Sequence, residues 1–221
     1  MKYRHPSTQR GFTLIELMVT VGIFVFFTGM TLMNYPKFKN NTAIALLAHD
    51  VALTVRQAQS YGLAVRSFGN HFPPWGAHFS TDTTLGGNMV LFADAKDWTD
   101  SIADTDTTKC NTDNCMYDVG ASGQCAADDI ECVEVYKMPS GARVRDVCVD
   151  SLQNCGFRGI DIVYQRPDPG ATFCLYTDSY TSCSRPGTVP ESVLIRIGYP
   201  DSTEDELRSV KIFTTGQISV Q

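Results

Sequence analysis

Polar and apolar positions divide the start of the chain into a short basic segment and a long apolar run. Residues 1–11 are polar and carry Lys2, Arg4 and Arg10 without an acidic residue. Residues 12–33 hold one charge, Glu16, in 22 positions. At ~1.5 Å per residue, a helix of that length crosses the hydrocarbon core of a bilayer. The pattern therefore predicts a transmembrane helix over residues 12–33 behind a basic leader.

The basic residues on the N-terminal side of this run predict its orientation. Cytoplasmic flanks carry the excess of Lys and Arg, so we expect residues 1–11 inside the cell and everything after residue 33 outside. This is the topology of a single-pass protein of the cytoplasmic (inner) membrane. An ordinary secretory signal fits less well, because its apolar region runs only ~7–15 residues and ends in small residues. A plain anchor that is never processed stays open at this point.

Helical periodicity continues beyond the apolar run, after a polar interruption. Residues 34–42 are NYPKFKNNT, and Pro36 predicts a kink or local melting because it removes a helix hydrogen bond. Residues 43–66 then place apolar side chains at helical spacing, which predicts an amphipathic helix packed on a sheet of the same chain. The apolar stripe comprises Ile44, Leu47, Ala48, Val51, Val55, Ala58 and Val65.

From residue 67 onward, short apolar runs alternate with Gly, Pro, Asp, Ser and Thr. This pattern predicts antiparallel strands of a small sheet. Residues 94–131, between the apolar runs at 89–93 and 133–138, are acidic and irregular. A loop of that length usually has a function or is held by disulfides. The predicted strands cover residues 89–93, 133–138, 160–165, 172–177, 192–199 and 210–220.

These patterns together predict an α+β fold. A long N-terminal helix over residues 12–66, with a transmembrane half and an amphipathic half, packs on a small antiparallel β-sheet head. The predicted organisation is a leader over 1–11, the helix over 12–66, and an extracytoplasmic head over 67–221 with a disulfide-rich insert at 94–155.

The chain has eight cysteines, and all of them lie between residues 110 and 183. Their even number, beside a membrane segment, predicts disulfides formed in an oxidising compartment, although free buried thiols are the alternative. Sequential neighbours are 5, 7, 7 and 9 positions apart, which favours four local bridges while leaving other connectivities open. The favoured pairs are Cys110–Cys115, Cys125–Cys132, Cys148–Cys155 and Cys174–Cys183.

The segment Arg10-Gly11-Phe12-Thr13-Leu14-Ile15-Glu16 resembles the prepilin peptidase site of type IV pilins and pseudopilins. The resemblance implies cleavage between Gly11 and Phe12, then N-methylation of the new Phe12 amine by the prepilin peptidase/methyltransferase. A carboxylate in a membrane-embedded helix is costly and therefore functional by default. Glu16 of one subunit is expected to neutralise the Phe12 amine of a neighbour during assembly.

The head resembles H-type minor pseudopilins and FimT/FimU-like pilins, apart from its cysteine-rich insert. The resemblance implies a structural subunit, rather than an enzyme, of a type IV pilus or a type II secretion-like filament. Its partners would be other pilin subunits through the helix, membrane lipid and the assembly machinery. An adhesive or DNA-uptake pilin is the alternative. The similar stretches are ALLAHDVALTVRQAQSYGLAVRS, VLFAD, IDIVYQRPDPGATF and VKIFTTGQISVQ.

Charge and side-chain chemistry limit the classes of ligand that the head is expected to bind. The formal net charge of −6 argues against nucleic acid as a partner, and we interpret Arg143, Arg145 and Arg158 as a solvated strand face. Trp75 is expected in a packed loop rather than as a surface aromatic for sugar. The histidines share no metal-ligand spacing, and no cofactor is expected other than calcium. A candidate calcium site, which resemblance to related pseudopilins suggests, uses Asp94, Asp104, Asp106, Asp113 and Asp118.

Overall fold

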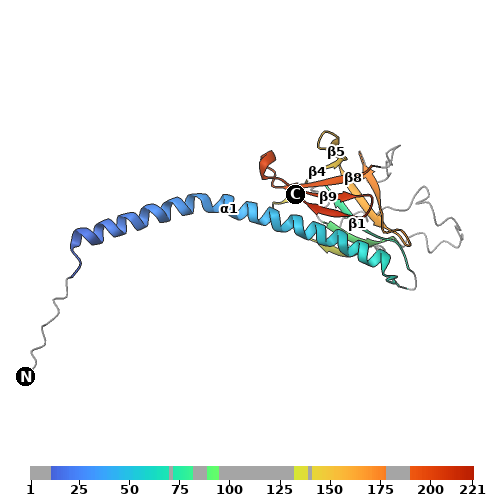
Figure 1. Ribbon diagram of the computed structural model, residues 1–221, viewed down its shortest axis with the longest axis horizontal. Coiled ribbons are helices and arrows are strands. Elements are labelled where there is room, and N and C mark those ends of the chain that lie inside the picture. The colour runs from blue at the N-terminus through green and yellow to red at the C-terminus, as the bar shows by residue number, and fades with distance from the viewer. Residues whose placement is uncertain (1–10, 70–71, 82–88, 95–131, 139–140, 178–189) are drawn as a thin grey trace, which may run out of the picture. The chain divides into compact units, whose positions relative to one another are not determined.

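The computed structural model describes residues 11–69, 72–81, 89–94, 132–138, 141–177 and 190–221 (Figure 1). The chain forms two compact units, Met1–Thr42 and Ala43–Gln221. The α+β class predicted from the sequence is confirmed, because one long helix is followed by antiparallel sheets.

Helix α1 runs from Leu14 to Leu63 as one 50-residue element. Along its apolar run the large hydrophobic side chains are 53% to 83% exposed. Of the kink or local melting predicted at residues 34–42, melting is wrong, since the helix continues through Pro36. A proline removes only its own N–H from the hydrogen-bond ladder, and the neighbouring turns keep theirs. Within the next turn the Thr42 hydroxyl also donates to the Phe38 carbonyl at 2.9 Å.

In the second unit, the apolar stripe of α1 is buried as predicted, except at its last position. Six of the seven residues are at most 1% exposed: Ile44, Leu47, Ala48, Val51, Val55 and Ala58. Val65 is 50% exposed and has a φ of 56°, because the helix has already ended at Leu63. Helical spacing predicts the face of a residue only while the helix lasts.

Among its described residues the head forms two five-stranded sheets rather than the single small sheet predicted. The first sheet has the order β3-β2-β1-β6-β7, and the second has the order β10-β9-β8-β4-β5. The strands of the first sheet are β1 Trp75–Ser80, β2 Met89–Ala93, β3 Cys132–Tyr136, β6 Gly159–Tyr164 and β7 Ala171–Tyr176. Those of the second are β4 Arg143–Val149, β5 Cys155–Phe157, β8 Ser192–Gly198, β9 Arg208–Phe213 and β10 Ile218–Val220, with a short 3₁₀ helix, η2, at Glu204–Glu206.

One hydrophobic core joins the second half of α1 to the inner faces of both sheets. Gly62 lets the helix approach β6 closely, since a Cβ there would lie 2.5 Å from the Tyr164 carbonyl oxygen. Gln59 holds the three layers together. Its side-chain amide donates to the carbonyls of Pro169 and Gly216, which lie in the turns after β6 and β9. The end of the helix therefore meets the turns of both sheets at one partly buried place.

Strand β1, the central strand of the first sheet, was not predicted. Its sequence, WGAHFS, contains a glycine and a histidine that obscure the alternation of a buried strand. The Phe92 ring of β2 lies where a side chain at Gly76 would point, at 2.3 Å from a built Cβ. His78 is paired with Asp161 of β6. Residues on the neighbouring strands thus fill the space beside Gly76 and pair with His78, so the segment is a strand and not a loop.

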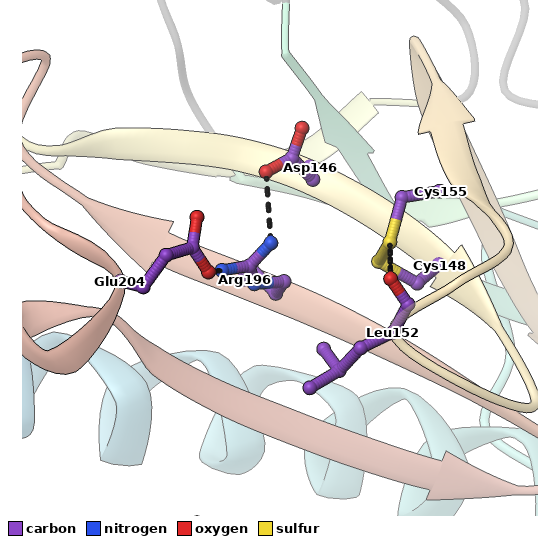
Figure 2. The surroundings of a disulfide bond; sticks show 6 residues. All are labelled: Asp146, Cys148, Leu152, Cys155, Arg196 and Glu204. Carbon is purple, nitrogen blue, oxygen red and sulfur yellow. Dashed lines mark hydrogen bonds and ion pairs between the residues drawn. A yellow bond between two sulfur atoms is a disulfide. The ribbon is translucent and has the colours of Figure 1, made fainter.

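The predicted disulfide-rich insert at 94–155 is in part regular structure, because β3, β4 and the first residue of β5 lie within it. Cys148 of β4 and Cys155 of β5 form one of the four predicted disulfides (Figure 2). The Leu152 carbonyl in the connecting loop lies 3.2 Å from Cys155 Sγ, a contact rather than a hydrogen bond because a disulfide sulfur carries no hydrogen.

Cys132 and Cys174 are also disulfide-bonded. Their predicted partners, Cys125 and Cys183, lie outside the described residues, as do Cys110 and Cys115. Those three pairings therefore stay predictions.

Removing the Cys148–Cys155 bridge is expected to weaken the head without unfolding it. The closed loop is short, so the double variant Cys148→Ala/Cys155→Ala should lose ~2–3 kcal/mol of unfolding free energy in the chain-entropy model. Denaturant unfolding of the full chain in detergent measures the loss. A double variant as stable as the parent would show that the bridge contributes nothing to the folded head.

Candidate functional site

The peptide bond between Gly11 and Phe12 lies in an exposed stretch just before the helix. Helix α1 begins at Leu14, so both residues are outside it. Phe12 is 83% exposed, and a Cβ built at Gly11 meets no atom within 4 Å. Proteases cleave exposed chain more readily than a segment held in regular structure. This bond is therefore accessible to a processing enzyme.

Thr13 determines where the helix begins. Its hydroxyl oxygen accepts the Glu16 backbone N–H at 3.3 Å, and its carbonyl accepts the Leu17 N–H at 3.2 Å. A threonine that caps the N–H three residues on, with Glu at that position, is the pattern of a capping box. Sequence reasoning missed this role, although Thr-x-x-Glu at 13–16 signals it. The cap keeps the Gly11–Phe12 bond outside the helix.

Glu16 occupies the first turn of α1. A carboxylate there is favoured by the positive end of the helix dipole and by the free N–H groups of that turn. Its side chain is exposed in the single chain. Cleavage at Gly11 would create an amine on Phe12, four residues before this carboxylate. The site thus combines an accessible peptide bond, a capped helix start and an acid within one helical turn.

The candidate calcium site is only partly within the described residues. Asp94 follows β2, is 6% exposed, and its backbone N–H donates to the Pro74 carbonyl at 3.0 Å. Asp104, Asp106, Asp113 and Asp118 lie outside the described residues. In the part of the chain that the structure describes, no three or more His, Cys, Asp or Glu residues gather as metal ligands would.

Two arginines of the second sheet, Arg145 and Arg196, are held by protein oxygens. Arg145 on β4 donates to the carbonyls of Tyr199, at 2.8 Å, and Pro200. Arg196 on β8 forms ion pairs with Asp146, at 3.3 Å, and Glu204 (Figure 2). An arginine whose donors are already occupied is less available to a phosphate. Arg145 and Arg196 are therefore less available to DNA than free arginines would be.

Trp75 is packed inside the head and is 1% exposed. Its indole N–H donates to the Arg66 carbonyl at 3.3 Å, and its ring meets Tyr61 edge-on at 4.9 Å. The Arg66 guanidinium in turn lies over the Tyr61 ring, 3.8 Å from its centre. The predicted packing of Trp75 is confirmed, although in a strand rather than a loop, and the ring is not a surface platform for sugar.

A buried polar cluster ties three strands of the first sheet together. His78 Nδ1 on β1 lies 2.5 Å from Asp161 Oδ1 on β6, and the Tyr176 hydroxyl on β7 donates to Asp161 Oδ2. All three side chains are at most 4% exposed. Their positions are far apart in the sequence, so spacing alone held no signal for them. Buried carboxylates are tolerated when they are paired and hydrogen-bonded in this way.

The comparisons with known proteins bear on the N-terminal end alone. Residues 6–32 match the family model described as the prokaryotic N-terminal methylation motif. No curated protein and no solved structure matches the chain. Helix α1 is also long and apolar enough to cross a membrane, and none of its most apolar stretch is buried. Residues 6–32 therefore carry a prepilin-type methylation motif at the start of a helix that could span a membrane.

Proposed function

We propose that this chain is a structural subunit, a minor pilin or pseudopilin, of a type IV pilus or type II secretion-like filament. Before assembly it spans the inner membrane, with residues 1–11 in the cytoplasm and the head outside the cytoplasm. Prepilin peptidase cleaves after Gly11 and methylates Phe12, and the apolar helix then enters the filament. The observation that carries the proposal is the methylation motif in register with an exposed apolar helix.

The exposed helix gives the proposal its physical basis. An apolar surface of this extent is stable only when something apolar covers it. Lipid can cover it in the membrane, and the helices of neighbouring subunits can cover it in a filament. Subunits can therefore move from one environment to the other while their helices stay covered.

Glu16 supports the assembly step. Inside a bundle of apolar helices, both its carboxylate and the Phe12 amine of a neighbour would be costly alone. Pairing them neutralises both charges and sets the position of one helix against the next. The cysteine-rich segment and the acids at 94–131 are not required for this role, and calcium there stays a secondary proposal.

Processing is the direct test of this proposal. In cells that contain a prepilin peptidase, the intact mass of the mature chain should correspond to a start at N-methylated Phe12. Gly11→Val should leave the full-length precursor, because a side chain at this position blocks close approach of the enzyme to the backbone.

Gly22→Val is the matched control for that variant. A Cβ at Gly22 also meets no atom within 4 Å, and the residue lies within the apolar run that begins directly after Gly11. This control should be processed as the parent is. Assembled protein that still begins at Met1 would refute the proposed function.

A further inference from the structure

A group of aromatic and basic residues follows the apolar run of α1. Tyr35 and Phe38 are 61% and 71% exposed, and Lys37 and Lys39 beside them are also exposed. The sequence has no Asp or Glu between residues 17 and 49. We call Tyr35, Lys37, Phe38 and Lys39 the collar. Apart from His49, its two lysines are the basic residues of the sequence between residues 17 and 49.

The aromatic residues of the collar continue an apolar face of the helix. Tyr35 and Phe38 lie at helical spacing from Phe27 and Thr31, and together with Met30 they line a shallow apolar hollow. Thr31 adds no polarity to this hollow, because its hydroxyl contacts the carbonyls of Phe27 and Thr28 in its own helix. The hollow thus offers an apolar surface directly beside two cations.

Pro36 indicates where this part of the helix meets water. Proline has no N–H, so the Leu32 carbonyl four residues earlier lacks its usual helix donor. An unpaired carbonyl is costly in hydrocarbon and cheap where water can reach it. The membrane boundary is therefore best placed between Leu32 and Pro36, which puts the collar in the headgroup region. Tyr and Lys side chains at that depth are typical of membrane interfaces.

The two lysines also oppose the predicted orientation. Lys37 and Lys39 lie closer to the apolar run than Lys2 and Arg4 do, although not as close as Arg10, and they are on the outer side. Positive charges on the outer flank reduce the difference in charge between the two ends of the helix, and that difference sets the orientation. Their placement is explained if they contact an anionic ligand on the outer surface.

We propose that the collar binds the headgroups of anionic phospholipids in the outer leaflet of the membrane. Lys37 and Lys39 contact the headgroup phosphates, while Tyr35 and Phe38 lie among the upper acyl chains. This inference rests on the proposed function, since it requires the chain to span the membrane. Lipid is favoured over a neighbouring subunit because the collar continues a 22-residue run that meets lipid before any assembly. The collar would fix the depth of the subunit until it is extracted.

The test uses the full-length chain in nanodiscs made from equal parts of phosphatidylglycerol and phosphatidylcholine. Native mass spectrometry of the released protein then counts the lipids that remain bound. The parent should retain phosphatidylglycerol preferentially. Lys37→Gln/Lys39→Gln should reduce the preference by about fivefold for each lysine, which corresponds to ~1 kcal/mol per cation near an anionic surface.

Arg56→Gln/Lys137→Gln is the matched control, because both cations are exposed but lie outside the collar. It should keep the preference of the parent. Equal retention of the two lipids by the parent, or an equal loss in the control, would overturn the collar proposal. So would a collar variant that keeps its lipid preference and fails only in filament assembly, since that result assigns the collar to a neighbouring subunit.

The two proposals fail in different ways. If the parent chain is absent from the membrane fraction after alkaline extraction of cells, the proposed function itself is wrong. If the parent is membrane-bound but shows no headgroup preference, only the collar proposal is wrong.

Discussion

Glu16→Ala protein is expected to reach the membrane and be processed, and then to be missing from filaments. Removing a charge from the bilayer eases insertion, so the amount of membrane-bound protein should not fall. In the filament, the Phe12 amine of a neighbour would be buried without its partner, a cost of ~3–5 kcal/mol. Incorporation should therefore fall by at least about a hundredfold. The measurement compares processed membrane protein with protein in sheared filaments.

Thr13→Ala separates this pairing from the capping role of the same turn. The Glu16 backbone N–H donates to the Thr13 hydroxyl, and the Glu16 carboxylate favours the first helical turn through the helix dipole, so a change at either residue disturbs the start of the helix. Loss of the cap costs ~1 kcal/mol but leaves the carboxylate in place. Thr13→Ala should therefore still assemble. If both variants fail alike, helix capping rather than charge pairing explains the role of Glu16, and normal incorporation of Glu16→Ala would disprove the pairing.

Asp161→Ala is expected to destabilise the head by ~3–5 kcal/mol. The change removes the acceptor of both His78 and Tyr176 and leaves two polar groups that were paired with it in a buried site. Because proteins have only ~5–15 kcal/mol of stability, much of the head should be unfolded at moderate denaturant. Denaturant unfolding of the full chain in detergent, followed by tryptophan fluorescence, gives the change.

Two further variants calibrate this loss. Asp161→Asn keeps an acceptor for Tyr176 and should cost less than the alanine change. Asp201→Ala alters an exposed acid in a turn and should stay within ~0.5 kcal/mol of the parent. A loss below ~1 kcal/mol for Asp161→Ala would mean that the cluster does not hold β1, β6 and β7 together.

Strands that are apolar throughout, or alternate regularly, were visible in the sequence. Residues 89–93, MVLFA, are β2 with the bounds that were predicted, because a strand buried on both faces needs an unbroken apolar run. The buried stripe of α1 was equally plain, since a helix that covers a core must repeat its apolar residues every three or four positions. Strand β1 was missed because Gly76 and His78 break its apolar pattern. Only the neighbouring strands β2 and β6 supply the side chains that make these two residues fit a buried strand.

The N-terminal motif could be recognised from the sequence alone, whereas the polar contacts inside the head could not. Gly11, Phe12 and Glu16 form a contiguous motif, so their relation is local and needs no tertiary contact. The cap by Thr13 was also local and was overlooked. In contrast, His78, Asp161 and Tyr176 come together only through strand pairing, and the arginines of β4 and β8 found their oxygen partners only when the second sheet formed.

The amino-acid sequence by itself determined the features that depend on neighbouring residues: the processing motif, the membrane-spanning length of the helix, its buried stripe and the local Cys148–Cys155 bridge. The tertiary structure alone decided that the strands divide into two sheets, that β1 is central, and that Gln59 joins the helix to two distant turns. The physical reason is the range of the interactions. Periodicity and spacing record contacts within one element, whereas register, sheet membership and buried polar pairing depend on partners that lie far away along the chain.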